Sequence, residues 1–283
     1  MRPTFLLVVP FVALASACAT SPSTRARAAD ADRKQQVHDL LKALETGETR
    51  AASVIDPTRY KQHNLGVADG VAGLATMLAH LPKGAIRVRP ARVFQDGDFV
   101  FAHTEYDLFG PKVGFDVFRF ENGLVVEHWD NLQSLPASPN PSGHTMLDGP
   151  TEAGDRDRTE SNKTTVRSFV DDVLVHGHLE NLPRFIDEPR YTQHSPLAGD
   201  GLSGLAKALD ALSRQGIIMK YDRLHRVLGE GNFVLAVSEG SFGGRPTAFY
   251  DLFRLENGKL VEHWDTIEPI PPRAEWKNEN GKF

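Results

Sequence analysis

The sequence predicts an α+β protein built from two tandem copies of one domain. A 15-residue segment occurs twice, as DVFRFENGLVVEHWD over Asp116–Asp130 and as DLFRLENGKLVEHWD over Asp251–Asp265, and 11 of its 15 residues are identical. In each copy, helix-like apolar spacing comes first and strand-like segments follow, which is the α+β order. With 283 residues, the chain is long enough for two ordinary domains.

The N-terminal segment is expected to direct export. A basic residue is followed by the apolar run Phe5–Leu14 and by small residues that end at Cys18, which is typical of a signal peptide over residues 1–18. Two interpretations stay open: a bacterial lipoprotein with lipid on Cys18, or ordinary cleavage after Ala17. Either one predicts a bacterial envelope protein, lipid-anchored or periplasmic, that meets the membrane only through an N-terminal lipid. Residues 19–32 are expected to be a flexible tether.

Composition narrows the function classes further. The chain has 40% hydrophobic and 24% charged residues and a net charge of −5, as is usual for a soluble globular protein. It has no basic run that would favour nucleic-acid binding, so no nucleic-acid partner is expected. Its one cysteine excludes an internal disulfide.

Each copy begins with an amphipathic helix. Apolar residues at the i, i+3, i+4 and i+7 positions form one stripe, made of Val37, Leu40, Leu41 and Leu44 in the first copy and of Val166, Phe169, Val170 and Val173 in the second. A short helix follows, and then related segments, IDPTRYKQHN and IDEPRYTQHS. A further helix begins at Gly70 in the first copy and at Gly201 in the second.

Strands fill the rest of each copy. They are predicted over 86–94 and 99–109, then over 217–228 and 233–242, with the repeated 15-residue segment after each pair. A stretch rich in Pro, Gly, Ser and Asp over 139–160 predicts a linker, so the copies span 33–138 and 161–283. Three helices would lie in the hollow of a curved sheet and leave a cone with a pocket at its open end.

The repeated segment predicts a β-hairpin. Asn122-Gly123 is the dipeptide best suited to the two φ > 0 positions of a type I′ turn. A two-residue loop would pair Phe120 with Val125, Phe118 with Glu127 and Asp116 with Trp129. We therefore expect Asp116, Glu127 and Trp129 to point inward, and His128 and Asp130 to point outward.

The motifs resemble a known family. Tyr-x-Gln-His before a Gly-x-x-Gly helix, followed by Asp-x-Phe-Arg-x-x-x-Gly-x-x-x-Glu-His-Trp-Asp, resembles the SnoaL-like branch of the NTF2-like superfamily, in particular its predicted aldol-condensation-catalysing group. The resemblance implies cone-shaped curved antiparallel sheets with N-terminal helices. It also implies pairing through the outer faces of the sheets, here as an intramolecular pseudo-dimer. Because the fold hosts isomerases, cyclases, dehydratases and binding domains, it does not decide the function.

One family position raises doubt about catalysis. The polyketide cyclases of this family use an aspartate four residues after the Trp as their acid-base group. The matching residues here are Gln133 in the first copy and Glu268 in the second. Glutamine does not exchange a proton at any useful pH, so the cyclase mechanism does not transfer to the first copy.

Three residues of the first copy are the candidate catalytic set: His63, His103 and Asp116. Their side chains could take up and release protons near neutral pH, Asp116 if burial raises its pKa. The matching residue to His103 is Val237, which suggests a function rather than a requirement of the fold. The alternatives are a His63 that caps a neighbouring element, a His103 that is a core or interface substitution, and an Asp116 satisfied by Arg or backbone N–H groups.

The expected binding residues surround this set. Substrate contacts in the first copy would come from Tyr60, Glu127, Trp129 and Gln133, and the second pocket would contain His194, Asp251, Trp264 and Glu268. Another interpretation is a metal site formed by His63, His103 and Asp116, but no HxxxH or HxH pair supports it. No metal and no other cofactor is therefore expected.

Two functions follow from these residues. The first is an exported SnoaL-like enzyme that transfers a proton next to a carbonyl, as in isomerase, aldol or lyase chemistry, on a small apolar or carbonyl-bearing molecule. The alternative is a non-catalytic binding or assembly domain of an envelope lipoprotein. The His/Asp set favours the enzyme with the first copy as the working one, whereas Gln133 favours the alternative.

Overall fold

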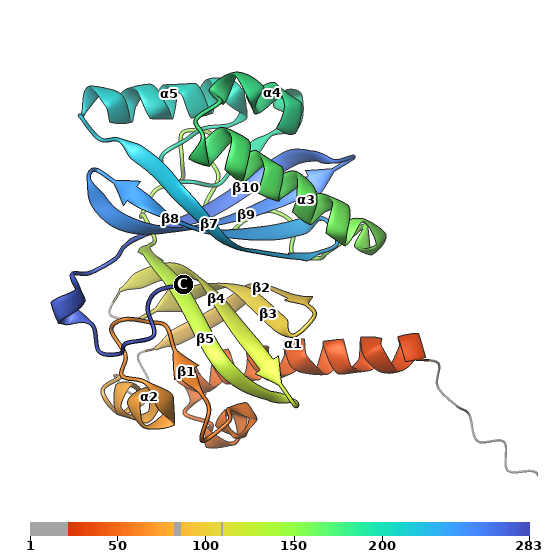
Figure 1. Ribbon diagram of the computed structural model, residues 1–283, viewed down its shortest axis with the longest axis vertical. Helices are drawn as coiled ribbons and strands as arrows, with labels where there is room; N and C mark the ends of the chain where they lie inside the picture. The colour runs from red at the N-terminus through yellow and green to blue at the C-terminus, as the bar shows by residue number, and fades with distance from the viewer. Residues whose placement is uncertain (1–21, 82–85, 109) are drawn as a thin grey trace, which may run out of the picture.

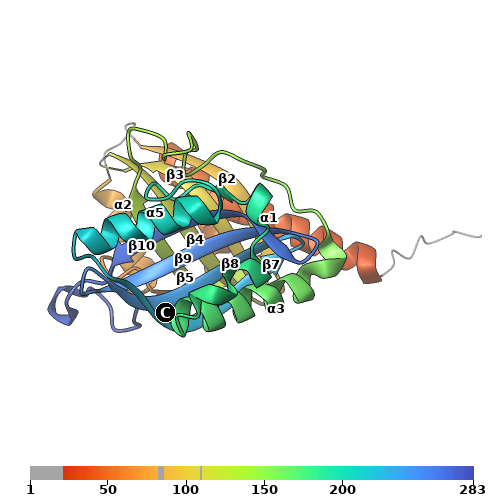
Figure 2. The same cartoon turned by 90° about the horizontal axis from the view of Figure 1, so that it is seen from above.

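The molecule has four layers, in the order helices, sheet, sheet and helices (Figure 1), and Figure 2 shows the same stack from above. The structure is a computed structural model and describes residues 22–81, 86–108 and 110–283. In the first repeat the elements are α1 (Pro22–Thr46), η1 (Thr49–Val54), β1 (Lys61–Gln62), α2 (Gly70–Ala79), β2 (Arg87–Asp96), β3 (Phe99–Asp107), β4 (Pro111–Glu121) and β5 (Leu124–Ser134). In the second they are η2 (Arg156–Arg158), α3 (Thr159–Phe169), η3 (Val170–Val175), η4 (Leu179–Asn181), α4 (Leu182–Phe185), η5 (Glu188–Arg190), β6 (Thr192–Gln193), α5 (Gly201–Arg214), β7 (Met219–Glu230), β8 (Phe233–Phe242), β9 (Arg245–Glu256), β10 (Lys259–Pro269) and η6 (Arg273–Glu275).

Each repeat has one five-stranded sheet with the same topology. The strand orders are β1-β5-β4-β3-β2 and β6-β10-β9-β8-β7. The four long strands form an antiparallel meander, and the short strand β1 or β6 pairs parallel with the last strand. The predicted α+β class with a curved sheet after the helices is confirmed.

The concave face of each sheet holds the first helix of its own repeat. The predicted stripe of α1 is buried there through Val37 and Leu41, against Val100 and Phe118 of the sheet. In the second repeat, α3 and the π-helical turn η3 present Val166 and its neighbours to the sheet in the same way. Burying one such aliphatic side chain contributes about 1.5–3 kcal/mol, so these stripes fix the helices on the sheets.

The convex faces of the two sheets pack against each other. This second core is made of Phe94, Phe101, Phe115, Val117, Trp129, Leu228, Phe233, Leu235, Val237, Ala248, Tyr250, Leu252 and Trp264, and every one of these side chains is at most 4% exposed. Polar contacts help to align the two sheets, because the Asn131 amide donates to both oxygens of Thr266 at 2.9 Å. The predicted pseudo-dimer of tandem repeats is therefore confirmed.

Ion pairs made by α1 and α3 are exchanged between the repeats. Lys34 of α1 binds Glu230 at 3.0 Å, and Lys163 of α3 binds Asp96 at 2.6 Å. Glu230 lies at the end of β7 and Asp96 at the end of β2, so each repeat supplies the acid for the other repeat's helix. Such reciprocal contacts are what a two-fold dimer makes.

Two extended segments cross from one repeat to the other. Residues 140–150, called here the linker strap, dock on the second repeat through the Asn140 amide, which donates to the carbonyl oxygens of Gln193 and Ala198. Residues 276–283, the C-terminal strap, dock on the first repeat, where the Asn278 amide donates to two backbone carbonyl oxygens. Part of the predicted linker is thus a structural element.

The N-terminal expectations have different outcomes. The expectation of a flexible tether over 19–32 is wrong from Pro22 onward, because α1 begins there. The segment contains several Ala and Arg residues, which favour helix. The predicted signal peptide over residues 1–18 and the lipidation at Cys18 lie outside the described residues. Among the described residues, no helix has the length and apolar character to cross a membrane.

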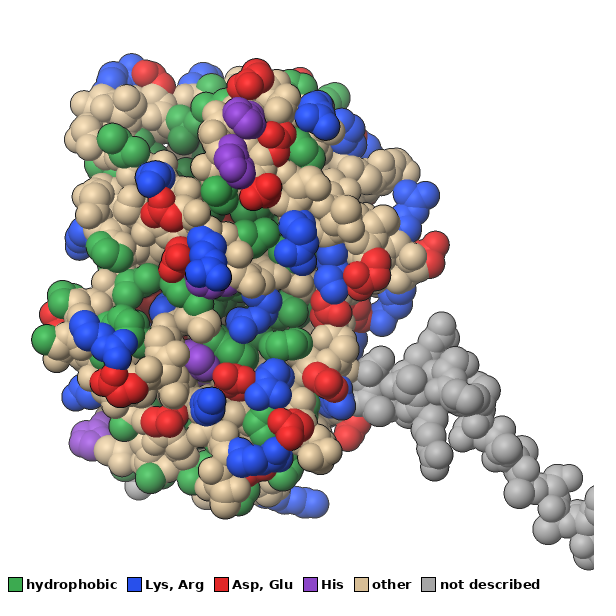
Figure 3. Space-filling view, in the orientation of Figure 1, with side chains coloured by type: hydrophobic (Ala, Val, Ile, Leu, Met, Phe, Trp, Pro, Cys, Tyr) green, Lys and Arg blue, Asp and Glu red, His purple; other side chains and the backbone are tan. Residues whose placement is uncertain are grey.

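On the face seen in Figure 3, acidic and basic side chains are interspersed.

Candidate functional site

A β-bulge decides which side chains of the hairpin face the helices. The turn forms as predicted, with φ of 52° at Asn122 and 82° at Gly123. Phe120 pairs with Val125, but Arg119 then pairs with Glu127, so Val126 has no partner across the strands. The extra residue reverses the facing of every residue after it in β5. The second repeat has the same bulge at Val261.

Several expected orientations are therefore wrong. Glu127 and Trp129 lie on the convex face, not in the concave hollow, and their counterparts Glu262 and Trp264 do the same. His128 and Asp130, expected to point outward, lie on the concave face beside Asp116 and Phe118. Asp116 itself faces inward as predicted.

The concave face of the first repeat holds a hydrogen-bonded network around Asp116. The Tyr106 hydroxyl of β3 donates to Asp116 Oδ2 at 2.5 Å, and His128 Nε2 of β5 lies 3.3 Å from Asp116 Oδ1. On the other side of the ring, His128 Nδ1 is 3.1 Å from Gln62 Oε1. The Gln62 amide in turn donates to the Tyr60 hydroxyl at 3.1 Å. Tyr60, which was expected to contact substrate, therefore belongs to this network.

Gln62 is held in one orientation by the backbone. Its Oε1 accepts the N–H of Asn64 at 2.8 Å, so the oxygen and not the amide nitrogen faces His128. Both ring nitrogens of His128 thus face oxygen acceptors.

The second repeat repeats the network with Asp251 at its centre. His263 Nε2 lies 3.0 Å from Asp251 Oδ1 and its Nδ1 lies 2.9 Å from Gln193 Oε1. The Tyr221 hydroxyl donates to the same carboxylate at 3.2 Å. Burial disfavours the charged ring, but the hydrogen bond and charge of Asp251 outweigh burial and raise the pKa of His263.

A second carboxyl of this network, Asp265, has a raised pKa. It is 8% exposed, and its Oδ1 has no hydrogen-bond partner among the described residues. Burial, opposed by His263 and reinforced by the charge of Asp251, raises the pKa of Asp265 to about 6. In the first repeat, the matching Asp130 accepts from the Asn64 amide at 2.6 Å, and the Lys282 ammonium lies 3.9 Å from its Oδ1. Asp130 Oδ1 likewise has no hydrogen-bond partner among the described residues, and Ser195 gives Asp265 a side-chain hydrogen bond in place of Asn64, so the two sites differ mainly in the nearby Lys282 ammonium.

His63 belongs to a different cluster on the convex side. Its ring stacks on Trp129 at 4.5 Å, its Nε2 lies 3.1 Å from Glu127 Oε1, and its Nδ1 lies 2.9 Å from the Gly281 carbonyl oxygen. Burial opposes ionisation of Glu127, but its bonds to His63 and Arg119 outweigh burial and lower its pKa to about 2. In the second repeat, His194 stacks on Trp264 and binds Glu262 in the same way.

His103 lies between the two sheets. It stacks on Phe115 at 4.3 Å, and its Nδ1 is 3.1 Å from Arg92 Nη1. Burial, and secondly the charge of Arg92, hold the pKa of His103 well below its ordinary value. The predicted catalytic set is therefore divided, with Asp116 on the concave face and His63 and His103 on the convex side.

Gln133 and Glu268 also lie at the interface of the sheets. Gln133 Oε1 accepts the N–H of Ile267 at 2.8 Å, and Glu268 binds Lys282 of the C-terminal strap. Neither side chain faces the concave network, because the alternation along β5 and β10 that places Asp130 and Asp265 inward turns these residues outward. The expectation that they belong to the pockets is wrong.

The sequence interpretation missed His128 and Asp130, with their counterparts His263 and Asp265. A signal was present, since both residues are identical in the two copies of the hairpin. The straight register of a two-residue turn nevertheless placed them on the outer face. Gln62 was likewise present in the quoted motif but received no role.

Three sets of side chains bring metal-ligating atoms within 4.8 Å of one another in the described residues. They are Asp116, His128 and Asp130, then Asp251, His263 and Asp265, and finally His144, Asp148 and His194. In the first two, both nitrogens of the single imidazole are used by the hydrogen-bonded network. The third set has two imidazoles and lies where the linker strap meets the second repeat.

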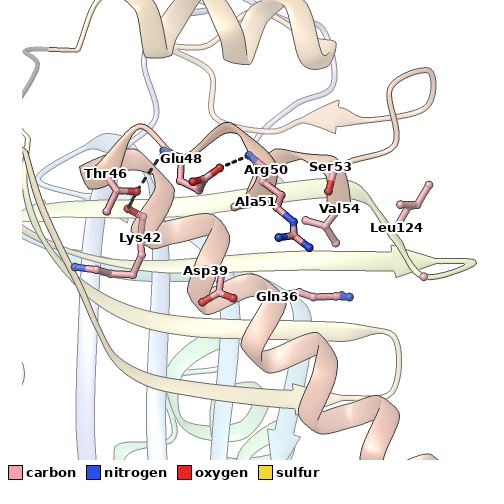
Figure 4. Close-up of a pocket in the computed structure, with 11 residues that line it drawn as sticks. Gln36, Asp39, Lys42, Thr46, Glu48, Arg50, Ala51, Ser53, Val54 and Leu124 are labelled. Atoms are coloured by element: carbon pink, nitrogen blue, oxygen red, sulfur yellow. Dashed lines mark hydrogen bonds between the residues drawn. The ribbon is translucent and has the colours of Figure 1, made fainter.

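Surface depressions lie elsewhere. One of about 670 Å³ lies between α1, η1 and the β4–β5 turn, where Asp39, Lys42 and Arg50 line it (Figure 4). Another of about 200 Å³ is lined by Lys34, Arg92 and Glu230. Neither is lined by a residue of the concave networks, whose central carboxyls Asp116 and Asp251 are buried.

Comparison with known proteins gives limited information. No protein-family model matches the chain, and no curated protein matches it. Among solved structures, TsrD from Streptomyces laurentii is similar at 21% identity, over 36% of this chain and 89% of that one, with a TM-score of 0.32. An NTF-2 like protein of unknown function from Burkholderia xenovorans is similar at 19% identity, over 38% and 89%, with a TM-score of 0.32.

A third similar structure is a putative ketosteroid isomerase from Kribbella flavida, at 18% identity over 41% of this chain and 87% of that one, with a TM-score of 0.31. At these identities and scores, the likenesses say nothing about what this chain binds or does.

Proposed function

We propose that the protein is a small-molecule enzyme that transfers a proton next to a carbonyl group, and that the second repeat carries the reaction. The observation that supports this most strongly is Asp265, a buried carboxyl with a pKa of about 6 and an unpartnered Oδ1. A group that titrates near the working pH can both take up and return a proton. Reaction types of this kind include isomerase, aldol and lyase chemistry.

The neighbouring groups fit the roles that such a reaction needs. Asp265 Oδ1 would accept a proton from the carbon next to the substrate carbonyl. Asp251, which pairs with His263, lies nearby, and its negative charge helps to raise the pKa of Asp265. The substrate would be a small apolar or carbonyl-bearing molecule.

Tyr191 would stabilise the negative charge that develops on the carbonyl oxygen. Burial, with the charges of Asp251 and Asp265, holds the pKa of Tyr191 well above its ordinary value. Its hydroxyl therefore stays protonated and remains a hydrogen-bond donor at neutral pH. A donor fixed in a dry site stabilises a developing oxyanion strongly.

The first repeat is a weaker candidate. Asp130 is compensated by Asn64 and by the nearby Lys282 ammonium, which leaves it less available as a base. The expected set of His63, His103 and Asp116 does not meet on one face of the sheet. The first repeat would then serve mainly to cover the convex face of the second.

Two observations favour the alternative, a non-catalytic binding or assembly domain. The contacts of tyrosine, aspartate, histidine and glutamine are the same in both repeats, as expected of a set that the fold itself requires. The networks are also closed, with Asp116 4% and Asp251 1% exposed. A substrate would reach Asp265 only after covering side chains move.

The first test measures proton abstraction without knowledge of the product. Candidate cyclic ketones and acyl lactones are incubated with the protein in D₂O, and loss of the α-proton signal is followed by NMR. Asp265→Asn should slow this exchange by roughly 10²–10⁴-fold, because one acid-base group is removed without a change in size. Circular dichroism confirms that the variant is folded.

The matched control is Asp130→Asn at the equivalent position of the first repeat, which should leave the exchange rate almost unchanged. The opposite pattern, with Asp130→Asn inactive and Asp265→Asn active, would assign the reaction to the first repeat. If neither variant changes an exchange that the wild type catalyses, the proton-transfer role of these carboxyls is refuted and binding becomes the better proposal.

We also propose that the protein is exported to the bacterial cell envelope. This rests only on the sequence of residues 1–18, with Cys18 as the site of lipid attachment. Mass spectrometry of the protein from membranes tests it, and a free thiol at Cys18 would leave a soluble periplasmic protein.

A further inference from the structure

The linker strap brings two side chains to a histidine of the second repeat. His144 and Asp148 lie on the strap, and His194 follows β6. Asp148 Oδ1 lies 2.7 Å from His194 Nδ1, and Asp148 Oδ2 lies 3.5 Å from His144 Nδ1. The carboxylate thus sits between two imidazole nitrogens of the same type.

These separations are close to those of a metal centre. Zinc bonds of about 2.0–2.2 Å to imidazole nitrogen and carboxylate oxygen place tetrahedral ligand atoms roughly 3.3–3.5 Å apart. The two observed separations, 2.7 and 3.5 Å, lie on either side of this range. Small side-chain rotations would seat an ion between the three groups.

The other nitrogen of each ring already faces a carboxylate. His194 Nε2 is 2.8 Å from Glu262 Oε1, and His144 Nε2 is 3.3 Å from Asp200 Oδ2. A metal-ligating histidine usually donates its second N–H to a carboxylate, which fixes the tautomer and strengthens the ligand. Both rings are therefore held with Nδ1 turned toward the same point.

The strap is held in place before any ion binds. The Arg92 guanidinium donates to the carbonyl oxygens of Leu147, Asp148 and Pro150, at 3.1, 2.6 and 2.8 Å. Gly149 has a φ of 95°, and a Cβ there would lie 2.6 Å from a Glu262 oxygen, so the strap runs tightly over the sheet. A prearranged loop loses little entropy when it binds a ligand.

The first repeat provides an internal comparison. His63 has the same stacking and carboxylate contact as His194. The Nδ1 of each ring also lies 2.9 Å from a backbone carbonyl oxygen of a strap, Gly281 for His63 and Thr145 for His194. The two straps share their asparagine anchors, and only the linker strap adds a histidine and an aspartate. These two residues therefore exceed what docking a strap on this fold requires.

We propose that His144 Nδ1, His194 Nδ1 and the Asp148 carboxylate bind one divalent transition-metal ion of the Zn²⁺ class. Two imidazoles and one carboxylate favour such ions over Ca²⁺ and Mg²⁺, which prefer all-oxygen sets. Solvent reaches the site, since the side chains of His144 and Asp148 are 31% and 44% exposed. Water would complete the coordination, and the bound ion would fasten the linker strap over Trp264.

The test uses the tag-free full chain, stripped with EDTA and titrated with ZnCl₂ by calorimetry. One equivalent should bind per chain, and a tenfold excess of Mg²⁺ should not compete. Loss of a residue that hydrogen-bonds to a metal ligand typically weakens metal binding about 10–100-fold, and Asp200→Asn should fall within that range. His144→Ala and Asp148→Asn remove ligands themselves, so each should weaken Zn²⁺ binding at least as much. Both ligands are on the exposed strap, so these variants should keep the wild-type circular dichroism spectrum.

The control removes another histidine pair of the second repeat. His176 and His178 lie in the exposed turn after η3, with rings 6.0 Å apart. The double variant His176→Ala/His178→Ala should bind Zn²⁺ like the wild type. The proposal is overturned if no Zn²⁺ binds, if this control abolishes binding, or if His144→Ala and Asp148→Asn leave the affinity unchanged. As a second readout, Zn²⁺ should raise the Tm of the wild type and not that of Asp148→Asn.

Discussion

Asp130 and Asp265 occupy equivalent positions but have different surroundings. Asp130 has an amide donor and a nearby ammonium group, whereas Asp265 has the Ser195 hydroxyl and lies beside the Asp251 carboxylate. In both residues one oxygen has no hydrogen-bond partner among the described residues. A buried carboxyl without a compensating partner prefers its neutral form. Its ionisation therefore opposes folding, and this cost depends on pH.

This cost gives a prediction about stability. The pKa of Asp265 rises from its usual 3.8 to about 6 in the folded protein. The folded state thus holds this proton more tightly than the unfolded chain, so the free energy of unfolding falls as pH rises from about 4 to about 6 and stays lower above that. The shift corresponds to roughly 3 kcal/mol.

Asp265→Asn removes the ionisation and should unfold at higher urea than the wild type at pH 7.5. At pH 3 the two proteins should unfold at nearly the same urea concentration, because Asp265 is then mostly neutral in both states. Urea titrations at several pH values measure the difference. A difference that is constant with pH would show that the gain does not arise from ionisation.

At the scale of elements, the hairpin shows what local sequence can specify. Asn122-Gly123 predicts the turn correctly, because only a few residue types adopt two successive positive φ angles. The bulge at Val126 has no comparable local signal. It arises because the strand must bend around the helices, which is a tertiary requirement. The sequence therefore did not predict that His128 and Asp130 lie on the concave face, although it named Tyr60 and Asp116 as site residues.

The bulge itself can be tested. Deleting Val126 would restore the straight register and turn residues 127–134 over, so that Asp130 would face the other sheet and Trp129 the helices. We expect the deletion to abolish cooperative unfolding of the chain. Val126→Ala keeps the bulge and should cost only roughly 1–3 kcal/mol for the lost methyl groups. A deletion variant as stable as Val126→Ala, by urea titration followed by circular dichroism, would contradict this account.

At the scale of the molecule, the pseudo-dimer was predictable and the straps were not. The duplicated segment, together with the sheet pairing that the resemblance implies, predicted that the two sheets pack against each other. The straps contact residues far away in the chain, such as Asn140 with Gln193 and Asn278 with Asn64. Their sequences show only turn-forming residues, so their docking depends on partners that exist only in the folded state.

The shared convex core implies that the two repeats unfold together. If one repeat unfolded alone, the other would expose an apolar face that includes Phe101 or Tyr250, at about 25 cal/mol for each Å². Val170 of η3 provides a test of this cooperativity, because its side chain is fully buried against the concave face of the second repeat's sheet. Val170→Ala should lower the free energy of unfolding by roughly 1–3 kcal/mol.

The effect should be visible in the other repeat. In a background with Trp264→Phe and Trp276→Phe, Trp129 of the first repeat is the only tryptophan of the chain. If the repeats form one cooperative unit, Val170→Ala shifts the urea midpoint of Trp129 fluorescence as far as it shifts that of circular dichroism. A Trp129 midpoint that stays in place while the circular dichroism transition splits would mean that each repeat unfolds alone. The convex core would then be a weak contact, despite its complete burial.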